Sequence, residues 1–173
     1  NGDIWTSSFE VWESAGANAF ERAHTLAVPG SWDSYYPGDA GDADNDGLAD
    51  LTVFGRTGND FYIRVYESRS TDGFPTEIAW ELPDDWWAVG AKIDDTDDDG
   101  ANEIVVAGQS FNYEQRVAIY ENDGDDSYTQ TFYQSVPDAH TSQSMEVADD
   151  LDGDGRDEIF FGGLIPNSAI VCA

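Results

Sequence analysis

Residues 42–50 read Asp-Ala-Asp-Asn-Asp-Gly-Leu-Ala-Asp, so acidic side chains occupy alternate positions up to a glycine at the sixth place. The pattern D-x-D-x-D-G-x-x-[DE] returns at residues 95–103 and again at residues 150–158. Carboxylates at alternate positions of a tight turn converge on one point, and the glycine permits the sharp bend. Hard oxygen ligands at that density suit Ca²⁺. The three stretches therefore predict three calcium sites, one in each copy.

The predicted ligands are the carboxylates at positions one, three, five and nine, with a backbone carbonyl at position seven. They are Asp42, Asp44, Asp46, Leu48 and Asp50, then Asp95, Asp97, Asp99, Ala101 and Glu103, then Asp150, Asp152, Asp154, Arg156 and Glu158. An EF-hand would close its loop with a glutamate at position twelve and continue into a helix. Position twelve is apolar in all three copies, being Val53, Val106 and Phe161. The loops are therefore expected to join two strands.

The alternative for any one loop is a solvated acidic turn that binds nothing. Four carboxylates a few ångströms apart repel one another by several kcal/mol at intermediate dielectric. Without a cation, such a loop should open or take up protons. Three copies in register favour the metal sites over the solvated turns.

The rest of the chain repeats with the loops, at a period of 54 residues. Four positions show the register: Phe9, Ile63 and Val117; Val11, Val65 and Ile119; Trp12, Tyr66 and Tyr120; Glu13, Glu67 and Glu121. Apolar residues alternate with polar ones around these positions, as expected for half-buried strands. The repetition predicts one supersecondary unit used three times.

Each unit is expected to contain four antiparallel strands. One of them should bury Ile78, Trp80 and their equivalents on a single face, and in the first copy this places His24 at a packed position. Small residues such as Gly38 and Gly90 suit a crowded strand near an axis. Continuous apolar runs at residues 51–54, 104–107 and 159–161 suit strands covered on both faces. The copies span approximately 9–60, 61–115 and 116–170 of a single segment, residues 1–173, and they predict an all-β fold of β-propeller blades.

Composition excludes several classes of function. Of 173 residues, 36 are Asp or Glu and 7 are Lys or Arg, so the net charge of −29 excludes nucleic acid as a partner. A hydrophobic content of 40% predicts a folded chain. The single cysteine, Cys172, cannot form an internal disulfide, and no stretch is long and apolar enough to insert into a membrane. The N-terminus is interpreted as a cut end.

The acidic loops, with Gly55, Gly108 and Gly163 after the apolar runs, resemble the FG-GAP or VCBS-type repeats of integrin-α-like β-propellers. The resemblance extends over nearly the whole chain. It implies that each calcium loop links the innermost strand of a blade to the second strand and has a structural role. The proposed ligands occupy the family's motif positions, with Glu in place of Asp at the ninth position of the second and third loops.

Three repeats are too few for a ring by themselves, because propellers close with about four to eight blades. Three arrangements remain open. The chain is a fragment of a longer propeller, which we favour, or copies pair to close a ring, or the repeats form an open array capped by neighbours.

In the resembling family, ligands approach the face opposite the calcium loops. Aromatic and histidine side chains expected there are Trp32, Trp86, Trp87, Phe111, Tyr113 and His140. They could stack on sugar rings or anchor a protein partner. Alternatively, the tryptophans close the gaps between blades.

Catalytic groups are scarce in this sequence. Two histidines, one lysine and no nucleophile motif leave little for a self-contained active site. We therefore expect a non-enzymatic, calcium-stabilised module for adhesion, binding or assembly, secreted or at the cell surface, where millimolar calcium is available. The alternative is a fragment of a secreted polysaccharide-degrading enzyme with a lyase-like propeller.

Overall fold

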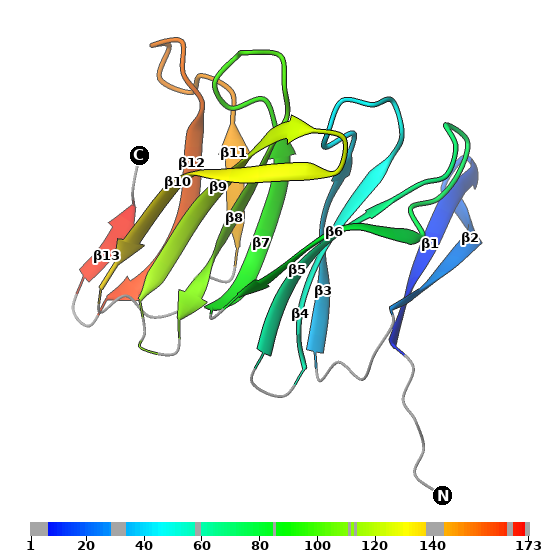
Figure 1. Ribbon diagram of the computed structural model, residues 1–173, viewed down its shortest axis with the longest axis horizontal. Helices are drawn as coiled ribbons and strands as arrows, with labels where there is room; N and C mark the ends of the chain where they lie inside the picture. Colours follow the sequence, from blue (N-terminus) through cyan, green and yellow to red (C-terminus); the bar gives the residue numbers. More distant parts are fainter. Residues whose placement is uncertain are drawn as a thin grey trace, which may run out of the picture.

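The computed structural model describes residues 7–28, 34–57, 60–84, 86–110, 112, 114–137, 144–165 and 168–171. Within these ranges every regular element is a β-strand, and every strand pair is antiparallel (Figure 1). The prediction of an all-β fold made of antiparallel strands is confirmed.

The strands form one hairpin and three sheets. The hairpin contains β1 (Ser7–Gly16) and β2 (Ala19–Val28). Sheet I contains β3 (Ser34–Gly41), β4 (Asp50–Thr57), β5 (Asp60–Glu67) and β6 (Glu77–Asp84). Sheet II contains β7 (Trp86–Asp94), β8 (Glu103–Ser110), β9 (Gln115–Gly124) and β10 (Ser127–Val136). Sheet III contains β11 (Met145–Ala148), β12 (Glu158–Ile165) and β13 (Ser168–Val171).

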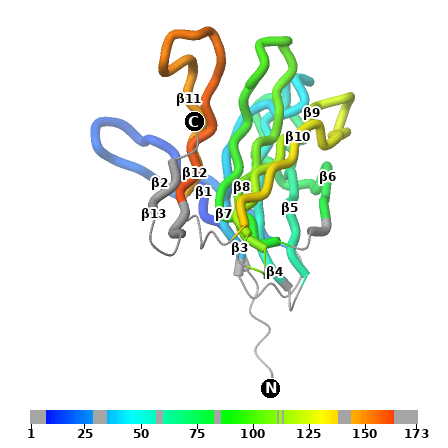
Figure 2. The backbone as a smooth tube through the Cα atoms, turned by 90° about the vertical axis from the view of Figure 1, so that its left-hand side faces the viewer, coloured from blue at the N-terminus to red at the C-terminus, as the bar shows by residue number. Residues whose placement is uncertain are grey.

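Strands that follow one another in each sheet also lie side by side, so each sheet is a simple meander. The first strands stand next to one another, because β7 contacts β3 on one side and β11 on the other. Figures 1 and 2 show the acidic segments between β3 and β4, β7 and β8, and β11 and β12 at the same end of the molecule. Two four-stranded meanders in this arrangement are consistent with propeller blades, and the described strands do not form a closed ring.

The sheets are out of phase with the sequence copies at 9–60 and 61–115. The first copy contains the hairpin β1–β2 together with β3 and β4 of sheet I. Sheet I itself runs from residue 34 to residue 84. A period fixes the length of a repeating unit but not its starting point, which depends on which strands pair.

Three buried clusters hold the sheets together. The cluster between sheets I and II includes Phe54, Ile63 and Ile104, and Trp80 contacts the rings of Tyr120 and Tyr128 at 5.5 and 5.2 Å. A second cluster joins sheet I to the hairpin, and a third joins sheet II to sheet III. Side chains of β4 and β8 enter a buried cluster on each face of their sheets. Both faces of these strands are therefore covered, which explains why their sequences are continuously apolar. In β12, the residues of the run 159–161 are only half-buried.

Small residues occur where the first strands approach one another. A Cβ atom on Gly90 would lie 3.0 Å from the Cβ of Met145 in β11. A Cβ atom on Gly38 would lie 3.0 Å from the Cβ of Ala91 in β7. Larger side chains at these positions would force the sheets apart, so the predicted crowding is present.

A β-bulge recurs in the last strand of sheets I and II and in β2. In β6, Trp80 lies opposite Val65 and Ile78 lies opposite Tyr66, so the residue between them has no partner. The extra residue moves Ile78 and Trp80 to opposite faces. The predicted single buried face is therefore wrong. Ile78 is 41% exposed and its equivalent Phe132 is 45% exposed.

In the hairpin the bulge lies next to His24, where Ala23 has no partner. His24 is half-buried, and its ring stacks on that of Phe74 at 5.0 Å. Packing against an aromatic ring agrees with the structural role predicted for this histidine.

Replacing Gly108 by alanine should destabilise the chain by about 1–3 kcal/mol, the usual cost of overpacking a core. The new Cβ atom would lie 2.2 Å from the carbonyl oxygen of Trp87 and 2.8 Å from the Cα of Ala88, and backbone atoms cannot move aside as a flexible side chain can. Urea denaturation measures the loss. Gly162→Ala in β12 is the control, because no atom lies within 4 Å of its new Cβ. Equal stability of the two variants would contradict this packing.

Candidate metal centre

Three loops of the same backbone shape join the first and second strands of the sheets. We call them loop 1 (42–50), loop 2 (95–103) and loop 3 (150–158). Two left-handed conformations recur in each loop, and loop 3 has a third at Asp150, where φ is 33°. At position four, φ is 63° for Asn45, 61° for Asp98 and 82° for Gly153. At position six, always a glycine, φ lies between 86° and 93°. Glycine adopts this conformation without the steric cost that a side chain would bring.

Three hydrogen bonds recur in all three loops. The backbone N–H of position two donates to the carboxylate of position nine, at 2.7, 2.7 and 2.8 Å in loops 1, 2 and 3. The N–H of position five donates to the carboxylate of position three, at 3.2, 3.2 and 3.1 Å. The glycine N–H donates to the carboxylate of position one, at 3.0, 3.0 and 2.9 Å. These bonds orient three of the four acidic side chains of each loop.

Loop 2 brings all four of its predicted carboxylates together. Asp95, Asp97, Asp99 and Glu103 each offer an oxygen atom within 4.8 Å of the others. This group could hold a metal ion.

Loops 1 and 3 each bring three of the four together. The loop 1 group is Asp42, Asp44 and Asp50, and the loop 3 group is Asp150, Asp152 and Asp154. The remaining loop 1 acid, Asp46, clusters instead with Asp44, Glu67 and Asp125. Glu158 of loop 3 accepts its backbone hydrogen bond but does not join that loop's group.

Position seven was predicted to supply a carbonyl oxygen. The N–H groups of Leu48 and Ala101 donate to the carboxylates of Asp46 and Asp99, at 2.7 and 2.8 Å. The Arg156 side chain is exposed and lies 4.0 Å from Asp154. Ligation by the three carbonyls stays a prediction.

Two carboxylate oxygens in the loops are buried and have no hydrogen-bond partner: Oδ1 of Asp42 and Oε1 of Glu103. The Glu103 side chain is 1% exposed, and its other oxygen accepts bonds from the N–H and the hydroxyl of Thr96, both at 2.7 Å. An unpartnered buried carboxylate oxygen is costly unless a cation or donor meets it. A cluster of such oxygens fits the hard-ligand preference of Ca²⁺.

Burial and mutual repulsion disturb the acids of these loops. Burial, together with the charges of Asp44, Glu67 and Asp42, raises the pKa of Asp50 to about 7. Burial also raises the pKa of Glu103, with contributions from Asp97 and Asp95. A divalent cation would offset this repulsion and favour the ionised carboxylates.

Loop 1 also contacts sheet II. Asn102 of loop 2 donates from its backbone N–H to Oδ1 of Asn45 at 2.8 Å, and from its side chain to the carbonyl of Asp42 at 2.6 Å. The turn between β9 and β10 reaches the same loop. The side chain of Asn122, near the end of β9, donates to the backbone carbonyl of Asp44 at 2.6 Å, and the N–H of Asp126, in the turn, donates to the Asp44 carboxylate at 3.0 Å. Loop 1 therefore connects two sheets.

The junction between sheets II and III has a different chemistry. Asp157, at the loop 3 position that corresponds to Asn102, lies in a carboxylate group with Asp94 and Asp149. Asn102, a neutral hydrogen-bond donor at the junction of sheets I and II, thus has an acid, Asp157, as its counterpart at the junction of sheets II and III. Sequence periodicity aligns these positions but does not show that they face a neighbouring sheet.

The opposite end of sheet II carries two of the predicted ligand-binding aromatics. Trp86 and Trp87 belong to the start of β7, rather than to a loop. Trp86 is 3% exposed and packs in the cluster between sheets I and II, so its side chain is closed to a ligand. Trp87 is 41% exposed and stacks on Phe61 with ring centroids 6.4 Å apart. The gap-filling interpretation fits Trp86, and of these two described tryptophans Trp87 is the one that presents an open surface.

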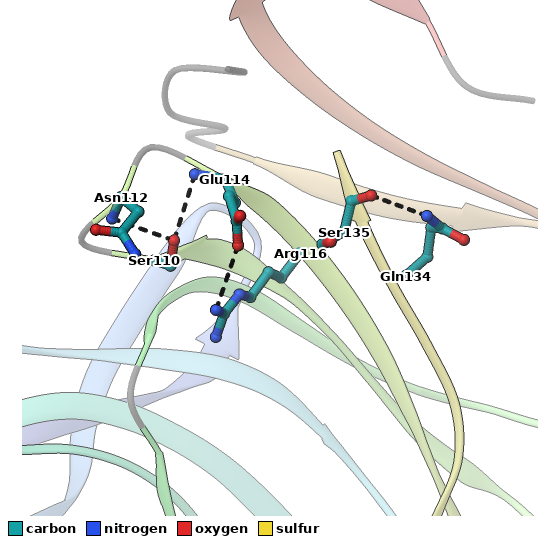
Figure 3. A network of polar contacts seen from close by, with 6 residues as sticks. All are labelled: Ser110, Asn112, Glu114, Arg116, Gln134 and Ser135. Carbon is teal, nitrogen blue, oxygen red and sulfur yellow. Dashed lines mark hydrogen bonds and ion pairs between the residues drawn. The ribbon is translucent and has the colours of Figure 1, made fainter. Parts of the chain in front are cut away.

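The turn between β8 and β9 lies at the same end. Figure 3 shows Ser110, whose hydroxyl oxygen accepts hydrogen bonds from the N–H groups of Asn112 and Glu114, both at 3.3 Å. Glu114 in turn pairs with Arg116 at 3.4 Å. Phe111 and Tyr113 of this turn lie outside the described residues, as do Trp32 and His140.

Sequence reasoning missed two acids that approach loop 1, one from β5 and one from the turn between β9 and β10. Glu67 and Asp125 share a cluster with Asp44 and Asp46. The 54-residue register contained a signal for one of them, because Glu67 has an equivalent, Glu121, in the next copy. Asp125 left no such signal, since its approach to loop 1 depends on how the sheets pack.

Residues 95–161 match the family model described as FG-GAP-like repeat. The match begins at the first residue of loop 2, continues through β8, β9 and β10 of sheet II and β11 of sheet III, and ends within β12. It confirms the resemblance for this part of the chain, which contains an FG-GAP-like repeat. Together with the antiparallel sheets, the repeat indicates a propeller-type module, of a kind typical of extracellular proteins and often calcium-binding.

No curated protein and no solved structure shows significant similarity to the chain. Across the part of the chain that the structure describes, no helix has the length and apolar character needed to cross a membrane.

In chelator, the thermal stability of the chain should fall as pH rises from about 4 to about 7. Burial raises the pKa values of Asp50 and Glu67 to about 7, from ordinary values of 3.8 and 4.5. The folded chain therefore binds more protons than the unfolded chain across this range, and ionisation disfavours folding. Melting temperatures at several pH values in EDTA measure the trend. A melting temperature that rises with pH would contradict it.

Proposed function

We propose that this chain is a calcium-stabilised, propeller-type binding module that acts outside the cell, in adhesion, recognition or assembly. The observation that carries the proposal is the threefold acidic loop, with the same hydrogen bonds and clustered carboxylates in each copy. The buried, unpartnered oxygens of Asp42 and Glu103 support a cation as the missing partner.

Calcium in these loops would act on the whole fold. Each loop connects the first strand of its sheet to the second, and loop 1 also bonds to Asn102 and Asn122 of sheet II. An ion that requires the folded loop stabilises the folded chain by mass action. Millimolar calcium outside cells would fill even sites of modest affinity.

The module is proposed to bind rather than to catalyse. Support comes from the sparse catalytic material in the sequence and from the exposed face of Trp87, which lies at the end of sheet II opposite loop 2. An indole face stacks on a sugar ring or anchors a protein partner. We propose a carbohydrate or protein ligand at this end, and further propeller blades, from this or another chain, as structural partners.

Calcium should raise the melting temperature, and EDTA should lower it again. At a calcium concentration of about 100 times Kd, each occupied site adds about 2.7 kcal/mol to the free energy of unfolding. Differential scanning calorimetry in calcium, in EDTA and in EDTA followed by excess calcium measures the effect. Magnesium at equal ionic strength is the control for charge screening. Identical melting curves in calcium and EDTA would reject the structural role of the ion.

Trp87→Ala should abolish ligand binding while the fold stays intact, because this side chain is exposed. Trp86→Ala is the contrasting variant, and it should lose about 3–5 kcal/mol of stability as a buried aromatic. A glycan array and a polysaccharide-cleavage assay on the same preparations separate a binder from an enzyme. Cleavage by the unmodified chain would favour the polysaccharide-degrading alternative over the binding module.

A further inference from the structure

Two glutamates outside the loop motif face the loops from the third strand of their sheets. Glu121 on β9 pairs in the ladder with Glu103 on β8, and Glu67 on β5 pairs with Asp50 on β4. The partner is in both cases the acid at position nine of a loop. Glu67 and Glu121 are 54 residues apart, so the same cross-strand pair of acids occurs in two sheets.

We propose that Glu121 is a further carboxylate ligand of the cation in loop 2, and that Glu67 has the same role in loop 1. The inference rests on the proposed calcium binding and extends the ligand set beyond the D-x-D-x-D-G-x-x-[DE] motif. Each metal site would then depend on three strands of its sheet instead of two.

The environment of Glu103 favours a cation between β8 and β9. Its side chain is 1% exposed, and Oε1 has no hydrogen-bond partner although the carboxylate lies within the loop 2 cluster. Like charges directly opposite each other on neighbouring strands destabilise a sheet. The burial of Glu103 increases that cost, because water screens the pair less than it would on an exposed strand. A cation held between Glu103 and Glu121 would turn the repulsion into attraction.

Within the described residues, neither glutamate has a basic partner that would neutralise its charge. Among the ion pairs of the described residues, none includes Glu67 or Glu121. The charged neighbours of Glu121 are acids, namely Glu103, Asp99 and Asp97. Glu67 lies in the cluster with Asp44, Asp46 and Asp125.

The coordination number of Ca²⁺ leaves room for one more ligand than the loop motif supplies. Ca²⁺ takes about six to eight oxygen ligands. Four carboxylates and one carbonyl of loop 2, each giving one oxygen, leave the shell short of that number. One further carboxylate, in monodentate or bidentate form, would bring it into the range without a ligand from another molecule.

Isothermal titration of the intact, chelator-treated chain with Ca²⁺ tests the assignment. Glu121→Gln should weaken one site by about tenfold or more, the scale on which supporting groups act at metal sites. Asp123→Asn is the matched control, because it removes the same charge from the same strand. Asp123 accepts a hydrogen bond from Thr129 at 2.5 Å, which an asparagine oxygen can also accept. The control should change affinity by less than about twofold, through screened long-range charge alone.

The melting temperature provides a second readout. Glu121→Gln removes one of two opposed acids, so in EDTA it should melt no lower than the unmodified chain, and its increase with calcium should be smaller. Glu67→Gln should repeat this behaviour for loop 1. Equal affinities of Glu121→Gln and Asp123→Asn would overturn the assignment, and so would a lower melting temperature of Glu121→Gln in EDTA. If the unmodified chain binds no calcium, the proposed function falls as well. If the unmodified chain binds calcium and both Glu67→Gln and Glu121→Gln bind it with unchanged affinity, the assignment of the two glutamates as ligands is overturned. The proposed calcium-binding function then stands.

Discussion

Repulsion between clustered carboxylates is the constraint on which this structure depends. Each loop places acids within 4.8 Å of one another where the first strand of a sheet passes to the second. Backbone N–H groups donate hydrogen bonds that stabilise some of these carboxylates, and the same bonds occur in all three loops. They leave Oε1 of Glu103 without a partner in a buried site. A bound cation would complete the compensation, so the fold and the ion are expected to be thermodynamically linked.

The loops are also part of the packing between sheets. Ala43 of loop 1 is fully buried in the cluster that joins sheets I and II, and Asn102 and Asn122 bond to the backbone of the same loop. At the other side of sheet II, Gly90 permits the close approach of Met145. Apolar contacts and small residues bring the sheets together, while the loops align their ends. A structural change in the loops would affect the packing between the sheets, and a change in that packing would affect the loops, because both involve the first strands of the sheets.

Much of this architecture is predictable from the sequence, since period and alternation are local signals. The strands, the acidic turns and the double burial of β4 and β8 follow from them. The starting point of each sheet does not, because strand pairing is a long-range property. The bulge that separates Ile78 from Trp80 is a backbone feature without a residue signature. Glu121 was visible as a repeated glutamate, but its position opposite Glu103 requires the strand register.

All three acidic loops lie at one end of the molecule (Figure 1). With a net charge of −29, the chain would then have its negative potential concentrated at that end until cations bind. Such a charge distribution behaves as a dipole in solution and orients the molecule as it approaches a charged body. An anionic cell surface or polysaccharide would repel the loop end, so the end that carries Trp87 would lead the encounter.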